Sequence, residues 1–264
     1  CDAAQLAVWI PLVRNMTVIG CYAQTELGHG SNVRAIETTA TYMIDDDTFE
    51  INTPTVTATK FWPGSMGRTA NTAMVMARLL TPDGKDHGVQ NFLVPIRDKE
   101  THEVLPGVQA GDIGPKYGYN NMDNGFLSFD HVRVPRSNMP ARFGAVDPTT
   151  GAFHRKGSPE EAAVAQKLKG ITMTQVRASI IQQAGRSLAM ACTIGIRYST
   201  VRHQGFKEGN VGEHQVLDYM SQQHRLLPLL ATCYCYHFAG LDIRKMMHQM
   251  NTLVDEGQEI PALL

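Results

Sequence analysis

The sequence lacks an excess of charge of either sign. It has 24 Lys and Arg against 25 Asp and Glu, which gives a formal net charge of -1 over 264 residues. Bulk electrostatics therefore do not favour nucleic acid or an acidic membrane surface as a partner. The sequence also shows no signal peptide at its start and no apolar run that we judge long enough to cross a bilayer, so we expect no membrane span.

Cysteines are few, and their spacing is not that of a disulfide framework. The five cysteines favour a reducing or disulfide-independent setting. Cys233 and Cys235 invite a metal interpretation, but residues two apart on a helix point about 200° apart. The ten histidines form no His-Glu-x-x-His pattern. We therefore expect Cys233 and Cys235 to pack in a helical core, and we predict no metal site.

Residues 17–140 have the pattern of a β domain. Residues 38–44 are rich in β-branched side chains, and residues 48–51 return as a strand after an aspartate turn, which predicts a hairpin. Further stretches compatible with strands are residues 73–80, 89–96 and 125–135. Short strands separated by turn residues are typical of a sandwich or a barrel.

From about residue 165 the periodicity becomes helical. Apolar residues recur on one helix face from Val176 to Ile194, and the glycines of residues 205–212 interrupt the pattern. A second helical pattern runs from Gln215 to about residue 250, with a kink expected at Pro228. Strands followed by antiparallel helices predict an α+β protein with two domains.

Residues 21–32 begin as an apolar, extended stretch and become a loop of glycines and small polar residues. Gly28 and Gly30 can adopt positive φ angles at little steric cost, and they let a ligand approach the backbone closely. Neutral donors and acceptors come from Gln24, Thr25 and Ser31. Such a loop suits a planar heteroaromatic ring or a phosphate.

Four segments carry a resemblance to a known family. Residues 24–32 (QTELGHGSN) resemble the flavin loop of peroxisomal acyl-CoA oxidases, which are members of the acyl-CoA dehydrogenase superfamily. Residues 60–64 (KFWPG) are similar to the second flavin-contacting segment of that family, and residues 112–118 (DIGPKYG) and 191–199 (ACTIGIRYS) also match it. The likeness follows the order of the family over nearly the whole chain, so it is more specific than one glycine motif.

The resemblance implies a central β-sandwich or barrel-like domain, followed by antiparallel helices of the acyl-CoA dehydrogenase type. It makes residues 1–16 the end of an N-terminal helical domain and residues 17–140 the β domain that binds flavin and acyl-CoA. Residues 141–160 are then a linker, and residues 161–264 are the start of a truncated C-terminal helical domain. On this basis we expect the chain to be a segment of a longer protein.

The resemblance also implies a function. The full enzyme would desaturate acyl-CoA to trans-2-enoyl-CoA with FAD and reduce O2 to H2O2, as a homodimer in the peroxisome. FAD would lie between the β domain and the helices. Desaturation needs a base for the α proton and an acceptor for the β hydride, and flavin is the acceptor. The family's base is a glutamate in a region that we expect downstream of Leu264, so we name no catalytic residue and expect the segment alone to be inactive.

Several residues match flavin or substrate contacts of the family. From the residues alone, Thr25 would be a turn or strand-edge group, but the resemblance makes it a hydrogen-bonding partner of the flavin ring. By the same comparison Gln24 would meet the ring edge, and Ser31 would meet the pyrophosphate end of acyl-CoA. Glu26 is better explained as a residue that orients the loop than as a base.

The corner at residues 62–64 distinguishes oxidases from dehydrogenases in this comparison. A turn is the plain interpretation of Trp62-Pro63-Gly64. The resemblance places Trp62 beside the flavin ring and the backbone of Gly64 close to it. Dehydrogenases typically have a threonine or serine after the tryptophan, so Pro63-Gly64 follows the oxidase pattern. We hypothesise that the small residue leaves space for dioxygen beside the ring.

The helical half supplies three more candidates. Residues 198–206 resemble the segment that reaches the flavin of the neighbouring subunit, so Arg202 could pair with its pyrophosphate. A solvated charge near a helix end is an equally good interpretation of Arg202. Gln215 could reach the adenosine half of FAD. Arg177, at the expected start of the helix, matches an arginine near the acyl-CoA, although a surface salt bridge explains it equally well.

Two other functions remain open at this point. An acyl-CoA dehydrogenase would deliver electrons to an electron-transfer flavoprotein, and Pro63-Gly64 argues against it. A non-catalytic acyl-CoA-binding or interaction module would keep the fold without the base. A glutamate ahead of a glycine-rich loop, beyond Leu264, would favour the enzyme over the module.

Overall fold

The computed structural model describes residues 1–156, 159–206, 209, 212–256 and 258, and the side chains of 159–174 and 254–255 are outside this description. The chain divides into two compact units, Cys1–Ala162 and Ala163–Leu264.

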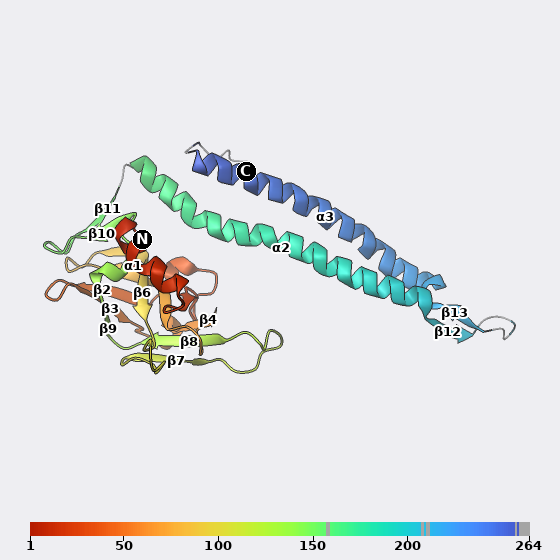
Figure 1. The fold of residues 1–264 in the computed structure, drawn as a ribbon, viewed down its shortest axis with the longest axis horizontal. Helices are drawn as coiled ribbons and strands as arrows, with labels where there is room; N and C mark the ends of the chain where they lie inside the picture. The colour runs from red at the N-terminus through yellow and green to blue at the C-terminus, as the bar shows by residue number, and fades with distance from the viewer. Residues whose placement is uncertain (157–158, 207–208, 210–211, 257, 259–264) are drawn as a thin grey trace. The chain divides into compact units, whose positions relative to one another are not determined.

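The first unit is mostly β (Figure 1). Its elements are α1 (Ala3–Arg14), β1 (Gly20–Ala23), β2 (Thr39–Met43), β3 (Thr48–Asn52), β4 (Lys60–Gly64), β5 (Thr72–Leu80), β6 (Asp86–Pro95), β7 (Val108–Asp112), β8 (Asn124–Phe129), β9 (Val132–Pro135), β10 (Gly144–Val146) and β11 (Phe153–Arg155).

Two sheets organise this unit. The larger one has six strands in the order β1-β5-β2-β3-β9, and β6 pairs with the other edge of β5. Both β1 and β2 run parallel to β5, and they share one of its edges: β1 pairs with its first half and β2 with its last three residues. The smaller sheet has the order β4-β8-β7 and is antiparallel.

The two sheets share one hydrophobic core. Phe49 and Phe92 of the large sheet are fully buried, and their rings meet edge to face with centroids 5.0 Å apart. Leu127 and Phe129 of β8 belong to the same buried cluster. Alternate residues of β2, β3 and β8 are buried, as expected for strands with one face on the core. The small sheet therefore packs one face on the large sheet.

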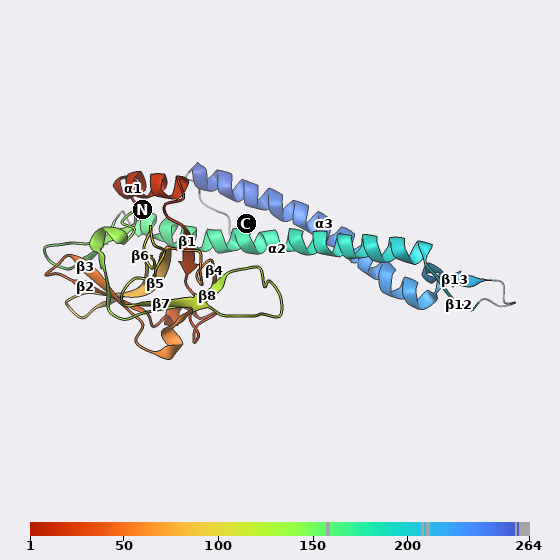
Figure 2. The same cartoon turned by 60° about the horizontal axis from the view of Figure 1, so that its bottom comes forward.

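Helix α1 lies on the outside of the sheets (Figure 2). It begins with a capping box, in which the Asp2 side chain accepts from the Gln5 nitrogen and the Gln5 side chain accepts from the Asp2 nitrogen. The Gln5 amide also donates to the carbonyl oxygens of Ser137 and Met139, each at 2.7 Å. Local capping and these long-range bonds together fix α1 to the β unit.

The second unit is a helical hairpin made of α2 (Pro159–Val201) and α3 (Met220–Asp255). Two short antiparallel strands, β12 (His203–Phe206) and β13 (Glu213–Gln215), join the helices. The helices lie side by side in both views (Figure 1; Figure 2). Gly185 faces Tyr236, and Gly195 faces Leu226, so the pairing runs in opposite directions along the two helices. Because glycine has no Cβ, it permits this close approach.

Helix α3 bears on the expectation of no membrane span. In the part of the chain that the structure describes, Met220–Leu253 is long and apolar enough to cross a membrane, with a mean hydropathy of 1.3 in its most apolar window. A single helix of this kind is weak support for a span, because a core helix of a larger helical assembly has the same length and composition. The expectation that the chain has no span is therefore not confirmed.

The α+β class and the order of strands followed by antiparallel helices are confirmed by the structure. Three local expectations differ from it. The stretch 125–135 is not one strand, because the chain turns at His131 (φ 51°) and passes from β8 in the small sheet to β9 in the large one. Gln215 ends β13 instead of opening a helix. Arg177 lies well inside α2, which begins at Pro159.

Candidate functional site

The two segments expected to contact flavin lie against each other. Residues 24–28 run antiparallel to residues 57–61. The backbone nitrogen of Phe61 donates to the backbone carbonyl oxygen of Thr25 at 3.1 Å. In return, the side-chain hydroxyl of Thr25 donates to the backbone carbonyl oxygen of Phe61 at 2.7 Å. Farther along, the Leu27 and Gly28 nitrogens donate to the oxygens of residues 59 and 57, each at 2.9 Å. These bonds fix the register between the loop and β4.

Gly28 is required by this close approach, not by a positive φ. Neither Gly28 nor Gly30 has a positive φ, which differs from the conformational freedom expected of them. A Cβ on Gly28 would lie 2.9 Å from the Thr57 Cβ, whereas a Cβ on Gly30 would meet nothing within 4 Å. Because Gly28 has no Cβ, the backbone of the loop can pack directly against Thr57.

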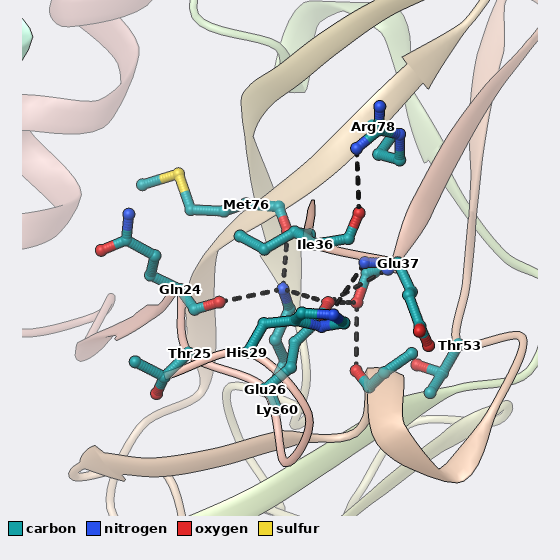
Figure 3. A network of polar contacts seen from close by, with 12 residues as sticks. Gln24, Thr25, Glu26, His29, Ile36, Glu37, Thr53, Lys60, Met76 and Arg78 are labelled. Carbon is teal, nitrogen blue, oxygen red and sulfur yellow. Dashed lines mark hydrogen bonds and ion pairs between the residues drawn. The ribbon is translucent and has the colours of Figure 1, made fainter. Parts of the chain in front are cut away.

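The Glu26 carboxylate lies at the centre of the loop, fully buried. One oxygen accepts from the Thr38 nitrogen (3.0 Å), the Thr38 hydroxyl (2.6 Å) and the Lys60 ammonium (3.0 Å). The other oxygen accepts from the Glu37 nitrogen at 2.9 Å and lies 3.0 Å from His29 Nδ1. Figure 3 shows Lys60, His29 and Glu37 around the carboxylate. Its contacts are those of a residue that orients the loop.

The Lys60 ammonium is equally buried, and all three of its hydrogens are used. Besides Glu26 it donates to the Gln24 oxygen at 3.2 Å and to the Met76 oxygen of β5 at 2.7 Å (Figure 3). One ammonium group thus joins the flavin loop, β4 and β5. An ammonium has three donors, so no further partner is needed.

The electrostatics favour a charged pair. Burial raises the pKa of Glu26, but Lys60 and the hydrogen bonds from Thr38 and Glu37 outweigh this, and the pKa lies below its usual value. Burial lowers the pKa of Lys60 to about 8, against the opposing attraction of Glu26. Both groups are therefore charged at neutral pH. Removing one partner of such a pair typically costs about 3–5 kcal/mol, because the other charge stays buried alone.

Strand β4 contains a bulge at the aromatic corner. Phe61 pairs with Phe126 and Gly64 with Asn124, so β4 has one residue more than β8 between these pairs. Trp62 takes a positive φ of 86°, which is unusual for a bulky residue and costs about 1–2 kcal/mol. The Asn124 amide donates to the Trp62 oxygen at 2.6 Å and holds this conformation. Trp62 is about half exposed, at 54%.

The space beside Gly64 is taken by a thioether. A Cβ built on Gly64 would lie 3.2 Å from Met122 Sδ and 4.0 Å from its Cγ, and among the described residues other than 63–65 no further heavy atom lies within 4 Å. The Met122 side chain is itself half exposed. The corner at residue 64 is therefore covered by one flexible side chain of the segment before β8.

The remaining candidates of the β unit lie around this corner and the loop. Figure 3 shows the side chains of Gln24 and Thr25 turned away from the Glu26–Lys60 pair. Both are half-buried, and Ser31 is exposed. Because the Thr25 proton is given to Phe61, the hydroxyl oxygen is left to accept a hydrogen bond from a ligand.

In the helical unit two candidates come together. His203 pairs with Gln215 across the β12–β13 ladder, and the Val216 nitrogen donates to the Arg202 oxygen at 2.8 Å. The Gln215 amide also donates to the Thr200 oxygen. Arg202 and Gln215 therefore flank one hairpin at the end of α2. Arg177 is exposed on α2, far along the helix from this hairpin.

Sequence reasoning did not single out Lys60, Met122 or Asn124. No local pattern marks Lys60 as buried, because its partners come from residues 24, 26 and 76. Met122 and Asn124 act on β4 from more than fifty residues away. Such residues can be recognised only once the strands are paired.

Two family models match the chain. The acyl-CoA dehydrogenase middle domain matches residues 21–132, and the acyl-CoA oxidase C-alpha1 domain matches residues 171–262. The chain is 44% identical over 262 residues to human peroxisomal acyl-coenzyme A oxidase 1, which covers 98% of this chain and 38% of the relative. It is 48% identical over 236 residues (88% of this chain, 34% of the relative) to an Arabidopsis thaliana protein named putative peroxisomal acyl-coenzyme A oxidase 1.2.

Solved structures agree with this likeness. Acyl-CoA oxidase 1 of Arabidopsis thaliana superposes with a TM-score of 0.88 at 43% identity, over 97% of this chain and 38% of that one. Acyl-CoA oxidase-2 of Caenorhabditis elegans, solved with FAD, ascaroside-CoA and ATP, gives 0.84 at 41% identity over 97% of this chain and 37% of that one. The chain spans less than two fifths of the length of these relatives.

Proposed function

Because this chain belongs to the peroxisomal acyl-CoA oxidase family, we propose that it is the central part of a flavin-dependent acyl-CoA oxidase. The full enzyme removes a proton from Cα and a hydride from Cβ of an acyl-CoA, which leaves a trans-2 double bond. The two electrons pass to O2, which becomes H2O2. FAD supplies the hydride acceptor for this chemistry.

One observation carries the proposal: the loop 24–32 and β4, the two segments expected to contact flavin, are hydrogen-bonded side by side through Thr25 and Phe61. The groups at this place suit an isoalloxazine ring. Thr25 offers an acceptor, Gln24 an amide, and Trp62 a half-exposed aromatic face. Ring-edge hydrogen bonds and an aromatic neighbour are what a planar heteroaromatic cofactor needs.

The residues divide into ring, pyrophosphate and substrate groups in this proposal. Gln24, Thr25, Trp62 and Gly64 hold the ring, and Ser31 lies at the CoA end. Arg202 and Gln215, which flank one hairpin, reach the FAD of a second subunit in a homodimer, where the guanidinium pairs with pyrophosphate. Arg177 contacts acyl-CoA. By analogy with its relatives, the enzyme works in the peroxisome.

A visible absorption spectrum of the purified full-length protein tests the proposal. The protein is mixed with an acyl-CoA without oxygen and is then exposed to air. Flavin bands that bleach with acyl-CoA and return quickly in air, with one peroxide formed per double bond, are the expected result. Bleaching that persists in air would instead indicate a dehydrogenase. A protein without flavin bands would contradict the proposal altogether.

A further inference from the structure

We propose that the buried Glu26–Lys60 ion pair is a positioning device for the flavin, which sets the distance between the loop 24–32 and the corner at residues 62–64. The inference rests on the proposed function, since it assumes that these two segments hold the ring. Both side chains are fully buried, so neither touches the ligand itself. They act through the backbone on either side of the ring site.

Lys60 makes all the hydrogen bonds of its side chain to residues of the loop 24–32 and of strand β5. Its ammonium binds the oxygen of Gln24, the residue directly before Thr25, and the oxygen of Met76 in the central strand β5. Lys60 itself directly precedes Phe61, whose oxygen accepts from Thr25. The position of Thr25 relative to Trp62 is therefore set by a group with three fixed hydrogen bonds.

Glu26 attaches the same loop to a further strand. Its two oxygens bind the nitrogens of Glu37 and Thr38, which lead into β2. Through Glu26 the loop is attached to β2, and through Lys60 it is attached to β4 and β5. A loop attached to three strands keeps its polar groups in place before a ligand arrives, and such preorganisation reduces the cost of binding.

A gain in folding stability does not by itself explain why the chain has a buried ion pair here. Replacing a buried ion pair by apolar groups of similar volume is often neutral or stabilising. A buried pair whose hydrogen bonds are all made within the protein, by contrast, is suited to specifying one arrangement of the segments around it, because charge-assisted hydrogen bonds are short and strong and their loss would leave a buried charge without a partner. Glu26 directly follows Thr25, and Lys60 lies two residues before Trp62. The arrangement that the pair fixes is therefore that of two residues proposed to contact the flavin ring.

The test compares stability with cofactor binding in the full-length enzyme. The variants are Lys60→Met, Glu26→Gln and the double variant, with Glu26→Asp as the conservative change. Phe49→Leu is the matched control, because Phe49 is a fully buried core residue of β3 that has no part in the network. For each variant, the urea midpoint of the apoprotein and the FAD dissociation constant are measured, together with the visible spectrum of the bound flavin.

We expect Lys60→Met to lower the urea midpoint and to raise the FAD dissociation constant about tenfold or more. In the double variant the midpoint should recover toward the wild-type value, because no lone charge is buried, while the FAD dissociation constant stays high. Phe49→Leu should lower the midpoint and leave the FAD dissociation constant within about twofold of wild type.

Several outcomes would overturn the inference. One is a double variant whose FAD affinity recovers together with its stability, since the pair would then act only on folding. Another is a Lys60→Met variant with unchanged affinity and spectrum. If Lys60→Met does not fold, Glu26→Asp decides: an affinity like that of Phe49→Leu contradicts positioning. A wild-type enzyme without flavin bands contradicts the proposed function as well, whereas flavin bands with unaffected variants contradict the positioning role alone.

Discussion

Replacing Gly64 by alanine is expected to slow the reoxidation of the flavin by dioxygen more than its reduction by acyl-CoA. The methyl group would enter a space in which Met122 Sδ lies 3.2 Å away and Met122 Cγ lies 4.0 Å away. It would therefore push Met122 aside and narrow the approach to the corner where the ring is proposed to lie. Because dioxygen must reach the ring and acyl-CoA is already bound, the oxidative half-reaction is the more sensitive one.

The structure also indicates that this variant will fold. Gly64 does not have a positive φ, so alanine can adopt its backbone conformation. Gly→Ala at such a site stabilises by about 0.4–1 kcal/mol through the unfolded chain. Moving the half-exposed Met122 side chain off its rotamer costs about 0.5–1.5 kcal/mol. The two effects nearly cancel, so the free energy of unfolding should change by less than about 1 kcal/mol.

Stopped-flow absorbance measures the two half-reactions separately. We expect the rate of reoxidation in Gly64→Ala to fall about tenfold, which corresponds to about 1.4 kcal/mol in the barrier, and the rate of reduction to change less. The control is Gly64→Ala combined with Met122→Ala, which removes the contacting thioether and should restore reoxidation. Equal slowing of both half-reactions would refute the idea that residue 64 controls access of dioxygen.

Three further expectations concern stability and are checked by urea unfolding. Gly125→Ala should lower the free energy of unfolding by about 3 kcal/mol or more, because its Cβ would lie 2.6 Å from the backbone Cα of Gly67, whereas Gly30→Ala should change it by less than about 1 kcal/mol. Phe92→Ala should cost about 3–5 kcal/mol, because Phe92 is fully buried against another phenylalanine, and a loss below about 1 kcal/mol would contradict the described core. The β unit should lose stability as the pH falls below 4.5, because the pKa of Glu26 is lower in the folded state than its ordinary value of 4.5, so the unfolded chain binds more protons there. Glu26→Gln should make that loss smaller, and an unchanged pH dependence in Glu26→Gln would contradict the assignment.

Much of the fold follows from local sequence patterns. The hairpin of β2 and β3 is predictable because β-branched residues alternate on either side of an aspartate turn, and the observed strands begin and end within one residue of the prediction. The helices are predictable from their periodicity over many turns. The exchange of sheets at His131 is harder to predict, because neither glycine nor proline separates the two apolar runs and only the phase of the alternation changes, from Leu127 and Phe129 to Val132 and Val134.

The site is predictable only in part, for a physical reason. The loop 24–32 can be recognised because its glycines and small polar residues lie together in the sequence. The charged pair that holds it cannot, since Lys60 meets Glu26 only after β4 has aligned with the loop. The same holds for Met122, which reaches Gly64 through the pairing of β4 and β8. Contacts of high sequence separation are fixed by tertiary structure and not by local propensity.

The pairing of β1 has a consequence for motion. This strand lies at the end of the large sheet and joins it through four parallel residue pairs with β5, while β2 supports the other half of the same edge. β1 can therefore detach while the β2–β5 and β5–β6 ladders stay intact. Residues 20–32 would open as one local unit only when the Glu26–Lys60 pair and the bonds of the loop to β4 also break, still at a free energy below that of global unfolding. Cofactor bound to this segment would oppose the opening, so residence time of the flavin and protection of these amides from solvent exchange would rise and fall together.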